Sequence, residues 1–124
     1  MYEERSDGGP GLLLRFSGEL DMVTAPGLRR RLEQAITGGA GGIVIDLTDV
    51  TFVDSLSLAS LVAAKHRLAP DGRLAVVAGE GFVDLMLRAA GLGGVLDLFG
   101  DEDDARDFAF GPGGGRREAA VGAP

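Results

Sequence analysis

The chain contains no cysteine, and that absence excludes several kinds of protein. Without thiols there is no disulfide framework, no thiol nucleophile and no cysteine-based zinc site, and the composition fits a reducing compartment. Long apolar runs are also missing, so no segment is predicted to span a bilayer. Residues 1–5 include acidic side chains and no apolar stretch, unlike a signal peptide. We therefore expect a cytoplasmic protein.

Basic residues are outnumbered by acidic ones. Lys and Arg total 12 against 19 Asp and Glu, which gives a formal net charge of −7. Nucleic acid and anionic membranes would repel such a surface, so neither is expected as a partner. A protein partner with a basic face is favoured instead. With 124 residues, the chain has the length of one domain that can bury its own core.

Short apolar segments alternate with amphipathic ones along the chain. We predict strands at residues 2–5, 12–16, 43–47 with a second run at 50–53, 74–78 and 95–99. We predict helices at residues 24–37, 55–69, 81–90 and 101–109. This alternation predicts an α/β fold, with a mixed β-sheet of about 4–5 strands packed against about 4 helices.

Residue types also predict some local details. Thr24, with Pro26 two residues later, is the predicted N-cap of the first helix. In the helix over 81–90, helical spacing predicts a buried stripe of Phe82, Leu85, Met86 and Ala89.

Residues 111–124 are rich in Gly and Ala and have little to bury. They are predicted to form a disordered tail after a single domain over residues 1–110.

The most informative point in the chain is the junction Asp54-Ser55, where an apolar strand is followed by a helix. Asp and Ser are both favoured N-cap residues, so one of them could stand here only to begin the helix. The same position would expose a hydroxyl beside a carboxylate at the positive end of a helix dipole, where N–H groups stabilise a phosphate. The two interpretations are compatible, and the residues alone leave both open.

Other candidate sites have simpler explanations. Four acidic residues could be considered as ligands of a metal ion: Asp21, Asp46, Asp49 and Asp54. Their expected positions at strand ends and in turns are the simpler explanation for them. His66 is the only histidine, and no Ser or Asp stands at triad spacing from it. The glycine-rich segments lack the Gly-Lys-Ser/Thr ending of a phosphate loop. The arginines at 29–31 are predicted to form a solvated helix face. We therefore expect no enzymatic activity, no bound metal and no cofactor.

Four segments occur in a distinctive order. They are Gly18-Glu19-Leu20-Asp21 before the first helix, Ile43-Val44-Ile45-Asp46-Leu47 as the central strand, Val50-Thr51-Phe52-Val53-Asp54-Ser55 before the second helix, and Ala90-Gly91-Leu92 after the third. Together they resemble the STAS domain family, named for sulphate transporters and anti-sigma factor antagonists. The resemblance covers about residues 10–110, and it implies a STAS-like α/β fold.

The resemblance also implies a function. In stand-alone bacterial members, a partner anti-sigma factor kinase phosphorylates the serine of the Asp-Ser junction, which here is Ser55. The unmodified antagonist binds the anti-sigma factor and frees a sigma factor, phosphorylation blocks that binding, and a phosphatase restores it. The implied role is a phosphoprotein that regulates transcription by partner switching, as in stress responses. The kinase would supply ATP and Mg²⁺, and a monomer is the simplest expectation. Predicted partner contacts are Asp21, Asp54, Ser55, Leu56 and Ser57.

The chain departs from the family motif just after the junction. The usual motif continues Asp-Ser-Ser/Thr-Gly-Leu-Gly, whereas Leu56, Ser57 and Ala59 stand here in place of a hydroxyl residue and two glycines. Ser57 adds a second hydroxyl and is the lesser candidate for phosphorylation. The alternative function, also implied by the family, is an accessory subunit of a membrane transport ATPase.

Overall fold

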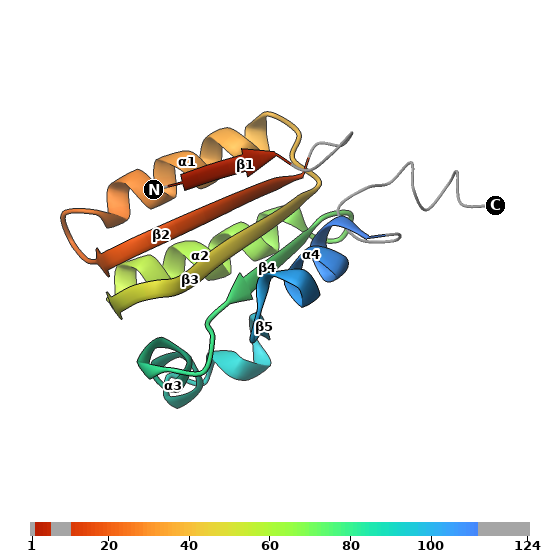
Figure 1. The fold of residues 1–124 in the computed structure, drawn as a ribbon. Helices are drawn as coiled ribbons and strands as arrows, with labels where there is room; N and C mark the ends of the chain where they lie inside the picture. Colours follow the sequence, from red (N-terminus) through yellow and green to blue (C-terminus); the bar gives the residue numbers. More distant parts are fainter. Residues whose placement is uncertain (1, 6–10, 112–124) are drawn as a thin grey trace.

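The structure, a computed structural model, is built on one five-stranded β-sheet with strand order β1-β2-β3-β4-β5 (Figure 1). It describes residues 2–5 and 11–111. β1 runs antiparallel to β2, and the other neighbouring strands are parallel. In chain order the elements are β1 (Tyr2–Arg5), β2 (Leu12–Leu20), α1 (Ala25–Thr37), β3 (Gly42–Val53), α2 (Ser55–Leu68), β4 (Arg73–Val77), α3 (Phe82–Ala89), η1 (Leu92–Gly94), β5 (Asp97–Phe99) and α4 (Glu102–Phe110).

Helices cover both faces of the sheet. On one face, α1, α2 and α3 share a buried cluster with the sheet, in which Leu61 of α2 lies with Ile43 and Ile45 of β3. On the other face, Ala105 of α4 belongs to a second cluster with Val44. Because side chains alternate along a strand, β3 is apolar in both directions, as a covered central strand requires. The predicted α/β fold is confirmed.

β3 is one continuous strand, although the sequence suggested two separate runs. Its last pair with β4 joins Asp46 to Val77, whereas pairing with β2 continues as far as Leu20 and Val53. The ends of β2 and β3 therefore project together beyond the rest of the parallel sheet. They carry the turn after β2 and the start of α2.

The predicted buried stripe of α3 is wrong. The helix buries Val83 and Leu87, which lie one turn apart. The four residues predicted to be buried lie outward or at the margin of the core: Phe82 (60% exposed), Leu85 (64% exposed), Met86 and Ala89. The physical reason is that α3 has only 8 residues and lies at the end of the sheet, where it has room to bury a single row of side chains.

The C-terminal part differs from the prediction in smaller ways. Gly91 turns the chain after α3 with a φ of 81°, Leu92–Gly94 then forms a 3-10 helix, and β5 begins at Asp97. The predicted tail lies outside the described residues apart from Gly111. Within residues 2–5 and 11–111, none of the helices has the length and apolarity that crossing a membrane would require.

Candidate functional site

Asp54 connects the end of β3 to the beginning of α2. Its backbone is extended, and its carboxylate accepts a hydrogen bond of 2.8 Å from the N–H of Ser57. Its own N–H donates to the carbonyl of Leu20 across the strand pair, over 2.9 Å. Asp54 is therefore the N-cap of α2, which confirms the capping interpretation for the first residue of the Asp-Ser pair.

Ser55 is the first residue of α2, and its side chain is exposed. Because Asp54 provides the cap, the Ser55 hydroxyl takes no part in it, and the structure gives it no side-chain hydrogen bond within the described part of the chain. The next side chain, Leu56, is also exposed. An accessible hydroxyl thus stands beside a carboxylate at a helix N-terminus, where backbone N–H groups and the helix dipole favour added negative charge.

Ser57 has the opposite environment. It is fully buried, and its Oγ has no hydrogen-bond partner among the described residues. Of the two serines considered as phosphate acceptors, the structure therefore places Ser55 at the surface and Ser57 in the core.

Asp21 follows β2 directly and lies beside the start of α2, because the last residues of β2 and β3 are paired. Its carboxylate accepts hydrogen bonds from the backbone N–H groups of Val23, at 3.0 Å, and Thr24, at 3.2 Å. The N–H bond from Thr24, followed by the one from Val23, lowers the pKa of the Asp21 carboxyl. This turn therefore holds an ionised carboxylate close to the Asp54-Ser55 junction.

Thr24 is the N-cap residue of α1, as the sequence predicted. Its side chain, however, makes no capping bond. Its hydroxyl instead donates to the carbonyl of Glu19, at 2.7 Å, and accepts from the N–H of Asp21, at 2.9 Å. These two bonds use the hydroxyl to close the turn, so it does not accept from the first N–H groups of α1. The closed turn leaves Met22 and Val23 82% and 85% exposed.

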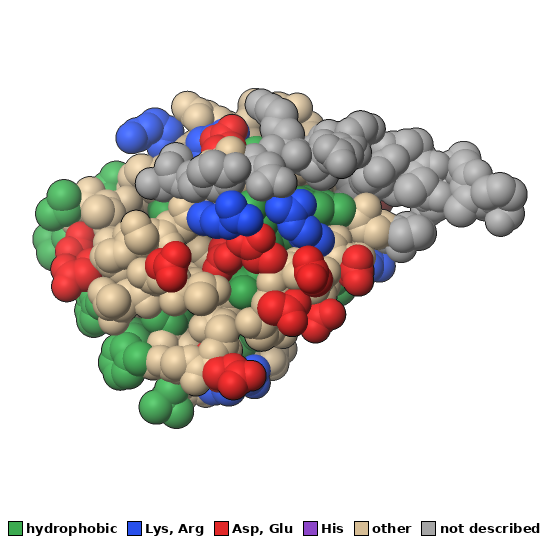
Figure 2. All heavy atoms as spheres, viewed as in Figure 1, with side chains coloured by type: hydrophobic (Ala, Val, Ile, Leu, Met, Phe, Trp, Pro, Cys, Tyr) green, Lys and Arg blue, Asp and Glu red, His purple; other side chains and the backbone are tan. Residues whose placement is uncertain are grey.

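Exposed apolar side chains gather at this end of the molecule. Figure 2 shows hydrophobic side chains at the end where β2 and β3 terminate and along the side occupied by α3 in Figure 1. The apolar rim, as we name this set, comprises Met22, Val23, Phe52, Leu56, Phe82 and Leu85. A monomer rarely exposes a large apolar patch unless a partner covers it. The sequence analysis named Leu56 of this set as a partner contact but assigned Phe82 and Leu85 to the core.

The four acidic residues considered for a metal do not come together. Asp46 lies on the α4 side of the sheet and Asp49 is exposed on β3, whereas Asp21 and Asp54 each accept backbone hydrogen bonds. Within the described residues, no group of three or more His, Cys, Asp or Glu side chains could hold a metal ion. His66 is exposed on α2.

Asp46 belongs to a separate polar cluster under α4. Its carboxylate accepts hydrogen bonds from the N–H and the hydroxyl of Thr48, at 2.8 and 2.5 Å. Burial, with a smaller contribution from Glu102, raises the pKa of Asp46. Arg15 donates to both carboxylate oxygens of Glu102, at 2.5 and 2.7 Å, and this pair lowers the pKa of Glu102 to about 2. The cluster joins β2, β3 and α4 and lies apart from the Asp54-Ser55 junction.

A family model identifies the class to which this fold and site belong. The STAS domain model matches residues 3–105, and the chain belongs to the STAS domain family. Among its relatives, the anti-sigma-F factor antagonist RsfB of Mycobacterium tuberculosis (strain H37Rv) is 29% identical over 93 residues, which are 75% of this chain and 76% of RsfB. The resemblance inferred from the sequence motifs is confirmed.

Solved structures show the same relationship. The crystal structure of an anti-sigma factor antagonist from Mycobacterium paratuberculosis is 32% identical, with a TM-score of 0.76, over 84% of this chain and 87% of that chain. The anti-sigma factor antagonist SpoIIAA in its unphosphorylated form is 21% identical, with a TM-score of 0.68, over 86% of this chain and 94% of that chain. At that identity, the likeness to SpoIIAA shows a shared fold.

Proposed function

We propose that this protein is an anti-sigma factor antagonist that binds an anti-sigma factor kinase and is switched off by phosphorylation of Ser55. The observation that carries the proposal is the exposed Ser55 hydroxyl at the start of α2, next to the capping carboxylate of Asp54. RsfB and the Mycobacterium paratuberculosis relative are both anti-sigma factor antagonists. SpoIIAA, which shares the fold, has been seen in an unphosphorylated and a phosphorylated form.

The surroundings of Ser55 suit a partner interface. A partner that covers the apolar rim would bury apolar surface, which favours binding. Leu56, which belongs to the rim, lies directly beside Ser55 in the chain. The net charge of −7 attracts a partner with a basic face. Unmodified protein would therefore bind the anti-sigma factor through this end of the sheet, with Asp21, Asp54, Ser55 and Leu56 inside the contact.

Phosphorylation of Ser55 would oppose that contact while leaving the fold intact. The helix N-terminus and its N–H groups stabilise a phosphate that adds a charge of about −1.5 to −2. In the complex, however, the same group would have to lose its water next to the carboxylates of Asp54 and Asp21. A penalty of about 3 kcal/mol weakens binding roughly a hundredfold, which is enough to release a partner.

Ser57 is the weaker acceptor in this proposal because its hydroxyl is buried. Its placement in the core also explains how the chain accommodates a serine at a position where the family motif has glycine. The kinase supplies ATP and Mg²⁺, a phosphatase regenerates the active antagonist, and the released sigma factor changes transcription. The antagonist needs no cofactor of its own and acts in the cytoplasm as a monomer.

Intact-mass spectrometry tests the acceptor. The protein, Ser55→Ala and Ser57→Ala are each incubated with a cognate anti-sigma factor kinase, Mg²⁺ and ATP. We expect one added phosphoryl group on the unaltered protein and on Ser57→Ala, and none on Ser55→Ala. A phosphoryl group that persists in Ser55→Ala would move the acceptor elsewhere.

Titration calorimetry with the same kinase tests the switch. We expect Ser55→Asp to weaken binding at least about tenfold, because one charge reproduces part of the effect of a phosphate. His66→Asp is the matched control, since it adds an acidic charge on the exposed surface of α2 outside the junction. Equal binding by Ser55→Asp and the unaltered protein would remove the switch. Absence of any kinase complex, together with co-purification with a membrane ATPase, would favour the accessory-subunit function.

A further inference from the structure

α1 and α2 run side by side in the same direction, and both begin at the end of the sheet where β2 and β3 terminate (Figure 1). A groove of about 270 Å³ lies between the two helices. Near the start of α2 it is lined by Leu56 and Ala59, and near the start of α1 by Arg29. The beginnings of the two helices therefore meet at the same end of the groove.

Two arginines line this groove, and their surroundings differ. Arg67, in the last turn of α2, forms an ion pair with Glu33 of α1. Arg29 is exposed, and among the described residues it has neither an ion-pair nor a hydrogen-bond partner. One arginine is thus matched by a carboxylate, whereas the arginine at the Leu56 end has an unpaired guanidinium.

Ser55 stands beside that end of the groove. It directly precedes Leu56 and lies one helical turn before Ala59, so Ser55 and Ala59 share a face of α2. The side chain of Ala59 is a single methyl group, which leaves room above it for a longer side chain from α1. Packed helices lie about 8–10 Å apart between their axes, and the ion pair of Arg67 with Glu33 shows that an arginine crosses this gap.

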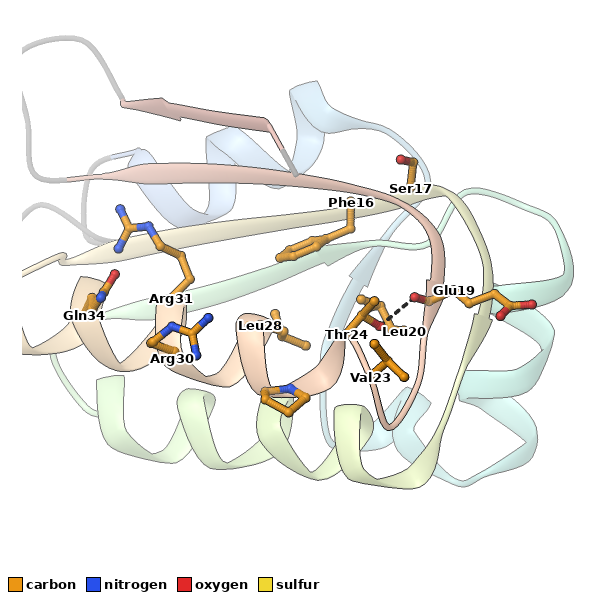
Figure 3. A pocket seen from close by; sticks show the side chains of 12 residues that line it. Phe16, Ser17, Glu19, Leu20, Val23, Thr24, Leu28, Arg30, Arg31 and Gln34 are labelled. Carbon is orange, nitrogen blue, oxygen red and sulfur yellow. Dashed lines mark hydrogen bonds between the residues drawn. The ribbon is translucent and has the colours of Figure 1, made fainter.

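Other cationic side chains that the structure describes are paired or distant. Five form ion pairs with carboxylates: Arg15, Arg31, Lys65, Arg67 and Arg88. Two more belong to the α4 side of the sheet: Arg73 and Arg106. Arg30 lies with Arg31 on the side of α1 that faces β2, where both line a separate pocket (Figure 3). His66 is in the last turn of α2, at the opposite end from Ser55. Among these described cations, Arg29 alone is both unpaired and next to Ser55.

We propose that Arg29 binds the phosphate of phosphorylated Ser55, across the start of the groove between α1 and α2. This inference rests on the proposed function, because it concerns the same modification. The guanidinium donates from two N–H groups to phosphate oxygens, which is the geometry that arginine favours with phosphate. The pair covers Leu56 and Ala59, so phosphorylation changes the shape of the partner-binding surface as well as its charge.

Arg29 would also influence how many charges the phosphate carries. The second pKa of phosphoserine is about 6. The carboxylates of Asp54 and Asp21 favour the singly charged form of a phosphate beside them, whereas a guanidinium favours the doubly charged form. Glu33, in the same groove, is already paired with Arg67. Arg29 therefore offsets the two aspartates and keeps the phosphate doubly charged at pH 7, the form that opposes partner binding most.

Phosphorus-31 NMR of a protein with phosphoserine encoded at position 55 tests the proposal. We expect the second ionisation of the phosphate to have a midpoint about 0.5 pH unit higher in Arg29→Gln, as Coulomb's law gives for a charge roughly 5 Å away in water. Arg30→Gln is the matched control and should stay within about 0.1 unit, because Arg30 faces β2 and salt screens it. Arg29→Lys keeps a positive charge and should restore at least about half of the difference.

A second measurement locates the contact. In ¹⁵N spectra at pH 7, the Nε–H resonance of Arg29 should shift between the unmodified and the phosphorylated protein, and that of Arg30 should not. Equal midpoints with and without Arg29→Gln would overturn the proposal, because the phosphate would then be solvated. Equal changes in Arg29→Gln and Arg30→Gln would also overturn it, since the phosphate would then respond only to the overall charge.

The encoded phosphoserine separates this test from that of the proposed function. A kinase that leaves Ser55 unmodified would contradict the switch, whereas the NMR titration requires no kinase. Equal midpoints would contradict only the contact with Arg29. Because Arg29 is exposed, its substitution should leave the midpoint of thermal unfolding nearly unchanged, so a loss of folding does not account for the result.

Discussion

The carboxylate of Asp54 accepts a hydrogen bond of 2.8 Å from the backbone N–H of Ser57, and this contact gives the first turn of α2 its orientation. As a result, two serines separated by one residue have opposite surroundings. Ser55 reaches solvent, whereas the Ser57 side chain enters the core without a hydrogen-bond partner among the described residues. The way in which the helix begins thus determines which of the two hydroxyls is accessible to solvent.

Asp54→Ala should destabilise the protein by about 1 kcal/mol, because α2 loses its only side-chain cap. The midpoint of thermal unfolding should fall by roughly 4 °C or somewhat more, as expected for a domain of this size. Differential scanning calorimetry measures the change. Asp54→Asn keeps an oxygen that can accept the Ser57 N–H and serves as the control. If both variants unfold at the same temperature as the unaltered protein, the cap contributes nothing to stability.

Ser57→Ala should raise the free energy of unfolding by about 1 kcal/mol, because it removes a buried hydroxyl that has no partner. Ser60→Ala provides the contrast, since the Ser60 hydroxyl donates to the Leu56 carbonyl at 3.0 Å and that bond is lost. Urea unfolding of both variants gives the comparison. A loss of stability in Ser57→Ala would mean that its hydroxyl has a partner in solution, such as a bound water.

The alternation of apolar and amphipathic segments was sufficient to predict the fold class. Ile43 and Val44 point to opposite faces of β3, and both are buried, as a two-sided apolar run requires. Strand length was harder to predict. Residues 48–53 of β3 pair only with β2, so their mixture of polar and apolar residues resembles a loop until the neighbouring strand is known.

Helical periodicity gave the wrong face for α3 for a different reason. A short helix with apolar residues on most of its surface has several possible stripes, and only tertiary packing chooses Val83 and Leu87 among them. The Asp54-Ser55 junction, in contrast, was visible in the sequence because capping depends on local residue types.

The ion pair between Arg15 and Glu102 should make stability depend on pH. The pKa of Glu102 falls from 4.5 to about 2 on folding, so its contribution is complete above pH 4.5 and is lost as the pH falls toward 2. Glu102→Gln should therefore lower the free energy of unfolding by about 1 kcal/mol at pH 7, once solvent screening is allowed for, and by less at pH 3. Urea unfolding at the two pH values measures this difference.

Asp46 should show the opposite sign. Burial raises its pKa on folding above the ordinary 3.8, so the group favours the folded state at low pH and opposes it as the pH rises through the folded-state value. Asp46→Asn keeps an acceptor for Thr48 but carries no charge. We expect it to be at least as stable as the unaltered protein at pH 7 and to lose that advantage at pH 3. A variant that is equally destabilised at both pH values would assign the cluster a packing role only.

Serine substitutions at Phe82 and Leu85 should separate binding from stability. Both side chains are more than half exposed, at 60% and 64%, so Phe82→Ser and Leu85→Ser should leave the unfolding midpoint nearly unchanged. If the apolar rim docks the anti-sigma factor, each should weaken that complex at least about tenfold, as expected for a covered apolar contact. Calorimetric titration measures the affinity.

Leu87→Ala is the matched control on the same helix, because Leu87 is fully buried. It should destabilise the protein by about 2–5 kcal/mol, and any loss of binding should disappear under conditions where it is fully folded. Unchanged affinity in both serine variants would place the anti-sigma factor elsewhere on the surface. Since Phe82 and Leu85 lie outside the buried row of Val83 and Leu87, their side chains can change with the partner at little cost to the fold.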